Sequence, residues 1–214
     1  PADSKAVMAE LTCETDFVAK NADFIAVGDK IAETALAKGY TDVQKELSDM
    51  VLDLATRVRE NMGLRRLTAV QAGGDEYIAH YVHSDKKTGV IVVLKSDKPA
   101  VLTDKTFQDF AYDCCLHAAA FTPLYVRKED VDTTYIDEQL EVFRGQVAEL
   151  QKPDNVKEGI VKGKLNKHLA EICFLEQAFV KDDKMSVAAK MKEVGKQLGA
   201  NISLSKLVLW QLGQ

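Results

Sequence analysis

The stretch Thr15-Asp16-Phe17-Val18-Ala19-Lys20-Asn21 marks the point where a predicted strand gives way to a helix. Residues 6–12 before it alternate loosely between the two faces of a strand, and apolar side chains take up helical spacing from Phe24 onward. Thr15 and Asp16 are both good N-cap residues. The residues alone favour a simple interpretation, in which Asp16 caps a helix and Phe17 packs beneath it. An aromatic beside an acid at such a corner can instead be an exposed anchor for a partner protein.

The first third of the chain continues as a small α+β unit. Apolar and small residues from 24 to 36 predict a helix that stops at Gly39, and residues 47–58 carry the apolar face of a second helix. Residues 64–71 then predict a strand, and the turn cluster Gly73-Gly74-Asp75 predicts a boundary. We therefore expect residues 1–75 to form a first core subdomain.

The remaining regular elements predict a second core subdomain from residues 76–127 and 174–214. Residues 77–83 and 89–95 are typical of a β-hairpin with a polar turn. Helices are expected after the caps Asp104 and Ser186, and the alternation from residue 201 to 212 predicts a final strand.

Residues 128–173 interrupt this second subdomain with two heptad patterns separated by a turn at 152–155. The apolar positions are Ile136, Leu140, Phe143, Val147 and Leu150 in the first pattern, and Val161, Leu165, Leu169 and Ile172 in the second. Two such seams predict an antiparallel coiled-coil hairpin. The predicted fold class is α+β, with two small subdomains that each have a mainly antiparallel sheet packed by helices, and with the hairpin inserted in the second.

Composition limits the classes of function. The chain has 214 residues and a net charge of −5. Because general binding to a phosphate backbone depends on clustered Lys and Arg, we expect no direct nucleic-acid binding. No apolar run approaches the roughly 20 residues that span a membrane, so no membrane association is expected. The four cysteines, Cys13, Cys114, Cys115 and Cys173, lack C-x-x-C spacing and are expected to be reduced thiols.

A search for catalytic motifs favours a binding protein over an enzyme. Residues 159–164 resemble a phosphate-binding loop, but the motif is one residue short and lies inside a predicted helix. Neither a paired-histidine zinc motif nor a nucleophile motif is present, so we expect no catalytic residues, no metal and no cofactor.

Several ordered blocks resemble the elongation factor Ts family, whose members are guanine-nucleotide exchange factors in translation elongation. The blocks are Glu14–Asn21 followed by Phe24, then Glu60–Arg66, Tyr81–His83 with Gly89–Val93, Lys152-Pro153 with Val161–Leu165, and Glu176–Val180. They keep their order along nearly the whole chain. The resemblance implies two core subdomains with a coiled-coil insertion, in agreement with the pattern of the residues.

The resemblance also implies a partner and a site. The partner is elongation factor Tu in its GDP-bound state, and Asp16 with Phe17 is the wedge that disturbs its Mg²⁺ and phosphate site. His83 matches a secondary contact, as do Val58, Arg59 and Asn61 in one loop. Thr15, Lys20 and Asn21 support the motif.

Two departures from the family pattern bear on these expectations. Arg59 stands where the family often has Gly, and nothing in the sequence matches the N-terminal helical module of the family, so we expect a fragment. The bacterial cytoplasm is the expected location, with an organellar origin left open. A homodimer or a 2:2 complex with the partner is also left open. The alternative function is a coiled-coil scaffold or adaptor that uses the hairpin 135–172, which a buried Phe17 would favour.

Overall fold

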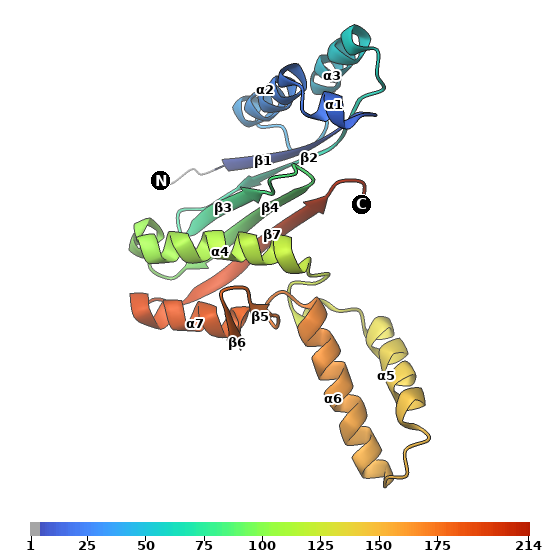
Figure 1. The fold of residues 1–214 in the computed structure, drawn as a ribbon. Coiled ribbons are helices and arrows are strands. Elements are labelled where there is room, and N and C mark those ends of the chain that lie inside the picture. Colours follow the sequence, from blue (N-terminus) through green and yellow to red (C-terminus); the bar gives the residue numbers. More distant parts are fainter. Residues whose placement is uncertain (1–4) are drawn as a thin grey trace.

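The computed structural model describes residues 5–214, which form two sheet-and-helix units and a helical hairpin (Figure 1). We call the first the N-terminal unit. Its strands are β1 (Lys5–Thr12) and β2 (Gly63–Gln71), and its helices are α1 (Asp16–Ala19), α2 (Ala22–Lys38) and α3 (Lys45–Val58). β1 and β2 pair antiparallel, and α2 and α3 lie on one face of this two-stranded sheet.

The core of the N-terminal unit follows from helical spacing. Ile31, Ala35, Leu47 and Val51 are buried between the two helices and the sheet. As predicted, α2 ends at Gly39, which takes up the left-handed conformation with φ of 69°. The helix predicted to follow Thr15 is split into α1 and α2, because Asn21 begins a new helix by accepting a hydrogen bond from the backbone N–H of Asp23.

The second sheet, with the helices that cover it, is the C-terminal unit. Its antiparallel strand order is β3 (Glu76–Val82), β4 (Thr88–Ser96) and β7 (Ile202–Gln211), and α4 (Lys105–Phe121) and α7 (Val187–Leu198) pack on one face. Val90, Val92 and Leu94 face these helices. Ile91 and Val93 point the other way, toward the N-terminal unit. The central strand β4 is therefore buried on both faces.

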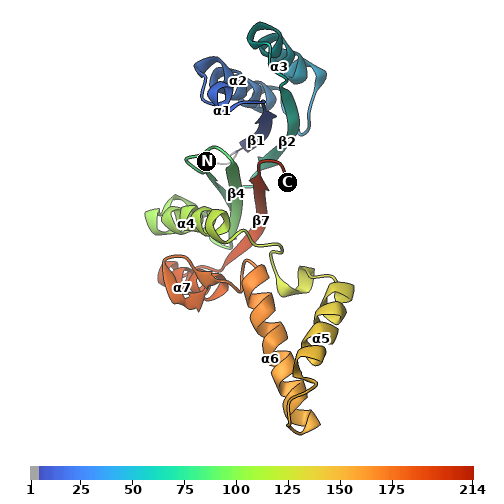
Figure 2. The same cartoon turned by 45° about the vertical axis from the view of Figure 1, so that its right-hand side comes forward.

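A helical hairpin extends away from both sheets (Figures 1 and 2). It consists of α5 (Thr133–Val147) and α6 (Asp154–Ile172), and a short 3-10 turn at Lys128–Asp130 precedes it. Another such turn, Pro99–Thr103, precedes α4. Val161 and Leu169 of the second predicted seam are buried. Leu150 was expected to continue the first seam, but α5 ends at Val147, and Leu150 is 40% exposed in the connection to α6.

The predicted α+β class with antiparallel sheets is confirmed, and Asp104 and Ser186 cap α4 and α7 as expected. The domain boundaries at 75/76, 127/128 and 173/174 stay a prediction, as does supercoiling of the hairpin. β6 (Asp182–Ser186), which pairs with β5 (Ala178–Phe179) in a small ribbon, was not predicted from the sequence. The four cysteines are free thiols, as expected.

Candidate functional site

Phe17 projects into solvent from the single turn of α1. Its side chain is 83% exposed, whereas the next residue, Val18, is 7% exposed. The interpretation in which Phe17 packs beneath a helix is therefore wrong, because Val18 takes the buried position. A large aromatic held outside the core contributes little to folding and is available to a partner.

Thr15 and Glu60 hold the start of α1. Thr15, rather than Asp16, is the N-cap, since its Oγ1 accepts a hydrogen bond of 3.3 Å from the backbone N–H of Val18. The Glu60 carboxylate accepts two hydrogen bonds from Thr15, one from the backbone N–H at 3.1 Å and one from Oγ1 at 2.7 Å. A four-residue helix has little stability of its own, so these contacts and the burial of Val18 fix the turn that carries Phe17.

Asp16 lies beside Phe17 and is itself exposed. Its carboxylate accepts a hydrogen bond of 2.8 Å from Lys20 Nζ, and this ion pair lowers the pKa of Asp16 below its ordinary value. Asn21 follows as the cap of α2. Thr15, Lys20 and Asn21, which the sequence marked as support for the motif, therefore each make a contact at this corner.

The loop between α3 and β2 carries three further residues marked by the sequence. Val58 is the last residue of α3 and is half-buried, while Arg59 and Asn61 are exposed. Arg59 occupies the left-handed region with φ of 61°, a conformation in which glycine carries no steric penalty. Because Glu60 bonds to Thr15, this loop and the Asp16–Phe17 corner form one surface.

Sequence reasoning missed the role of Glu60. The residue stood in a block that resembled the family, but its position gave no sign that it would accept both hydrogen bonds from Thr15, 45 residues earlier. The pairing of β1 with β2 brings the two together, since Thr12 ends β1 opposite Gly63. The contact could have been predicted only from the register of β1 with β2.

His83 belongs to the C-terminal unit, whereas the surface around Phe17 belongs to the N-terminal unit. It follows β3 and begins the turn to β4, where its backbone N–H donates to the Thr88 carbonyl. The ring is exposed, and its Nδ1 lies 2.9 Å from the hydroxyl of Tyr81. A neighbour two residues earlier therefore orients the His83 ring.

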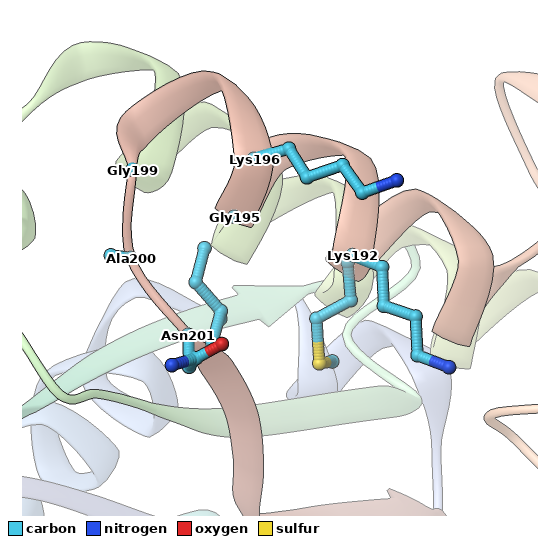
Figure 3. A pocket seen from close by; sticks show the side chains of 8 residues that line it. Lys192, Gly195, Lys196, Gly199, Ala200 and Asn201 are labelled. Carbon is cyan, nitrogen blue, oxygen red and sulfur yellow. The ribbon is translucent and has the colours of Figure 1, made fainter.

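Within residues 5–214, no cluster of three or more His, Cys, Asp or Glu side chains is arranged to hold a metal ion. A hollow of about 450 Å³ lies between α7 and the start of β7, and Figure 3 shows Lys192, Lys196 and Asn201 around it. Its lining contains no carboxylate or histidine.

Across residues 5–214, the helices are too short or too polar for any of them to cross a membrane.

Comparison with known proteins gives concordant matches along the chain. A family model described as Elongation factor TS matches residues 14–214. The elongation factor Ts of Treponema denticola is 72% identical over 209 residues, which cover 98% of this chain and 75% of that protein. That of Treponema pallidum (strain Nichols) is 58% identical, covering 98% and 73% respectively. That of Borrelia recurrentis is 38% identical, covering 95% and 73%.

Proposed function

The chain belongs to the elongation factor Ts family and is thus a translation elongation factor, and on this premise we propose that it promotes GDP release from elongation factor Tu. In this proposal the chain binds the GDP-bound GTPase directly, as a protein partner in the bacterial cytoplasm. It makes no covalent bond, and it needs no cofactor, membrane or nucleic acid to act.

The observation that carries the proposal is the exposed Phe17 on a turn that the Thr15–Glu60 hydrogen bonds and the buried Val18 hold in place. Burying a phenylalanine side chain contributes about 1.5–3 kcal/mol. The chain forgoes this contribution in its own fold, because Val18 fills the core position instead. Docking on a partner recovers this free energy of burial. Because the Thr15–Glu60 contacts already order the turn, docking costs less conformational entropy.

Asp16 and Phe17 act together as a wedge in this mechanism. Phe17 enters the nucleotide-binding domain of the partner near its Mg²⁺ and phosphate site, and Asp16 engages polar groups there. Asp16 is paired with Lys20 in the free chain, so Lys20 either accompanies it or releases it on docking. Val58, Arg59 and Asn61 extend the contact from the adjoining loop, and His83 adds one from the C-terminal unit.

Exchange then follows from coupling between two ligands on one partner. The wedge favours a state of elongation factor Tu that holds Mg²⁺ and GDP weakly, and by reciprocity GDP weakens the binding of this chain by the same factor. Each tenfold loosening of GDP requires about 1.4 kcal/mol of differential binding. One buried aromatic with its surrounding contacts supplies one or two such factors.

The alternative is an adaptor that binds only through the α5–α6 hairpin. The hairpin does expose apolar side chains, among them Val142 and Val156. Such a protein has no use for an exposed, fixed Phe17, so the N-terminal unit favours exchange over the adaptor.

The test is the release of fluorescent GDP from elongation factor Tu. We expect the parent chain to accelerate release and Phe17→Ala to lose most of the acceleration while melting at the parent temperature. Leu52→Ala is the matched control, because Leu52 is 62% exposed on α3 of the same unit. No acceleration by the parent chain would overturn the exchange function, and equal acceleration by Phe17→Ala would overturn the assignment of the wedge.

A further inference from the structure

Glu10 is a buried carboxylate in the contact between the two units. It lies on β1 and is 7% exposed. Its oxygens accept hydrogen bonds from Arg65 Nη1 at 2.9 Å, from Arg66 Nε at 2.5 Å and from the backbone N–H of Gly213 at 3.2 Å. Two of these donors belong to the N-terminal unit and the third follows the last strand of the C-terminal unit.

Arg66 extends this contact to the end of β7. Its Nη2 donates to the Gln211 carbonyl at 3.1 Å, and its guanidinium lies 4.4 Å from the ring centroid of Trp210. On the other side, the backbone N–H of Leu212 donates to the Lys87 carbonyl at 2.7 Å. Residues 210–213 are thus attached both to the N-terminal unit and to the β3–β4 turn that begins at His83.

Apolar packing continues the same contact. Met8 of β1 lies against Gly89 of β4 so closely that a Cβ on Gly89 would stand 2.5 Å from the Met8 sulfur. Val70, Ile91 and Val93 are buried beside it. The two units therefore meet through a small apolar patch with a charged cluster at its edge.

This contact lies near the residues proposed to bind the partner. β1 ends at Thr12, five residues before Phe17, and the turn attached to residues 210–213 begins at His83. Antiparallel pairing places the start of β4 opposite the end of β7, and the end of β1 lies on the same side of the molecule (Figure 1).

We propose that Glu10, Arg65, Arg66 and residues 210–213 form an interunit clip, a positioning device that sets the N-terminal unit relative to the C-terminal unit so that Phe17 and His83 reach one partner together. The role in exchange rests on the proposed function. When Phe17 and His83 are held on one rigid body, binding through either residue makes binding through the other intramolecular and so increases the affinity. This gain in affinity is lost when the two units can move relative to each other.

The charge state of Glu10 is consistent with the clip. Burial by itself raises the pKa of Glu10, but the hydrogen bonds from Arg65, Arg66 and Gly213 outweigh burial and hold the pKa below its ordinary value. The carboxylate is therefore ionised at neutral pH, pairs with both guanidinium groups and offsets one of their two positive charges. Replacing it with an amide would leave two arginines sharing one neutral acceptor.

The first test measures orientation in the whole chain. Nitroxides on Asp53→Cys in α3 and Lys192→Cys in α7, in a Cys13→Ser background, report the distance between the units. We expect Glu10→Gln to broaden this distance distribution while the chain stays folded. Arg66→Lys is the milder second variant, because it keeps the charge but loses the stack on Trp210 and the second donor. Glu46→Gln, at an exposed ion pair of the N-terminal unit, is the control.

The second test asks whether Phe17 and His83 act as a pair in GDP release. In the parent, the loss on combining Phe17→Ala with His83→Ala should be smaller than the product of the single losses, because either one already removes the advantage of pairing. With Glu10→Gln the single losses should multiply, and the half-saturating concentration of the otherwise unaltered chain should rise about tenfold.

The outcomes separate the two claims. An unbroadened distance distribution in Glu10→Gln and Arg66→Lys would overturn the clip. A broadened distribution with unchanged coupling between Phe17 and His83 would overturn its role in exchange. If the parent chain does not accelerate GDP release, the proposed function fails, and with it the role of the interunit clip in exchange. The distance measurements would still show whether Glu10 and Arg66 hold the two units together.

Discussion

Removing the Glu60 carboxylate should weaken partner binding without touching the wedge itself. Glu60 accepts two hydrogen bonds from Thr15, at 3.1 and 2.7 Å. Net hydrogen bonds contribute about 0.5–1.5 kcal/mol each, and the partly exposed position favours the lower end, so we expect Glu60→Ala to remove about 1–2 kcal/mol. The remaining support for α1 is the Thr15 cap and the burial of Val18.

The loss should appear mainly as a smaller population of the binding-competent turn. A penalty of about 1–2 kcal/mol lowers the ratio of competent to incompetent turn about 5- to 30-fold, and the apparent affinity falls by a factor that has this value as its upper limit. In a GDP-release titration, the half-saturating concentration of Glu60→Ala should rise by this factor while the rate at saturation stays near that of the parent. If all of the loss reaches the global stability, the melting temperature falls by about 2–8 °C.

Two further variants complete this experiment. Glu60→Gln keeps one acceptor oxygen for Thr15 and should fall between the parent and Glu60→Ala. Glu46→Ala removes an exposed carboxylate of the same unit, which is paired with Lys38. This variant should accelerate GDP release from elongation factor Tu as much as the parent does. A half-saturating concentration of Glu60→Ala equal to that of the parent, or a decrease only in the rate at saturation, would show that Glu60 does not hold the turn of α1 for binding.

Three other substitutions have distinct expected results. Val18→Ala should lower the free energy of unfolding by about 1–3 kcal/mol in urea titrations, whereas Phe17→Ala should leave it unchanged; equal effects would contradict the assigned faces of α1. Arg59→Gly should raise the unfolding free energy by about 0.5–1 kcal/mol, because glycine fits the left-handed position; a loss would show that the Arg59 side chain stabilises the loop. Glu10 has a lower pKa in the folded chain than the ordinary value of about 4.3, so its ionised form adds stability that is lost as the pH falls below about 4. The stability gap between the parent and Glu10→Gln should shrink over that range, and a constant gap would contradict an ionic role.

Much of the fold was predictable because local chemistry decided it. Gly39, Asp104 and Ser186 end or begin helices as their residue types favour. The alternation of residues 201–212 agreed with β7, whose apolar side chains Ile202, Leu204 and Leu207 pack in the core of the C-terminal unit. β6 was missed because its residues Asp182-Asp183-Lys184 are polar, and only pairing with β5 makes them a strand.

The candidate site was less predictable, for a related reason. Thr15 begins α1 and Asn21, six residues later, begins α2, but only the first of these two helix starts was predicted. Burial of Val18 instead of Phe17 depends on where α1 meets α2 and the sheet, which no local pattern records. The contact of Glu60 with Thr15 depends on the register of β1 with β2.

The most direct measurement is the thermodynamic coupling between this chain and GDP on elongation factor Tu. Titration of the partner, with and without GDP, gives the factor by which each ligand weakens the other, for the parent chain and for Phe17→Ala. If Phe17 is the wedge, the factor should be large and reciprocal for the parent. For Phe17→Ala it should be at least about tenfold smaller, which corresponds to a loss of roughly 1.4 kcal/mol or more of differential binding. A parent chain that binds both forms of the partner equally well, or a Phe17→Ala variant with the full coupling, would contradict this prediction.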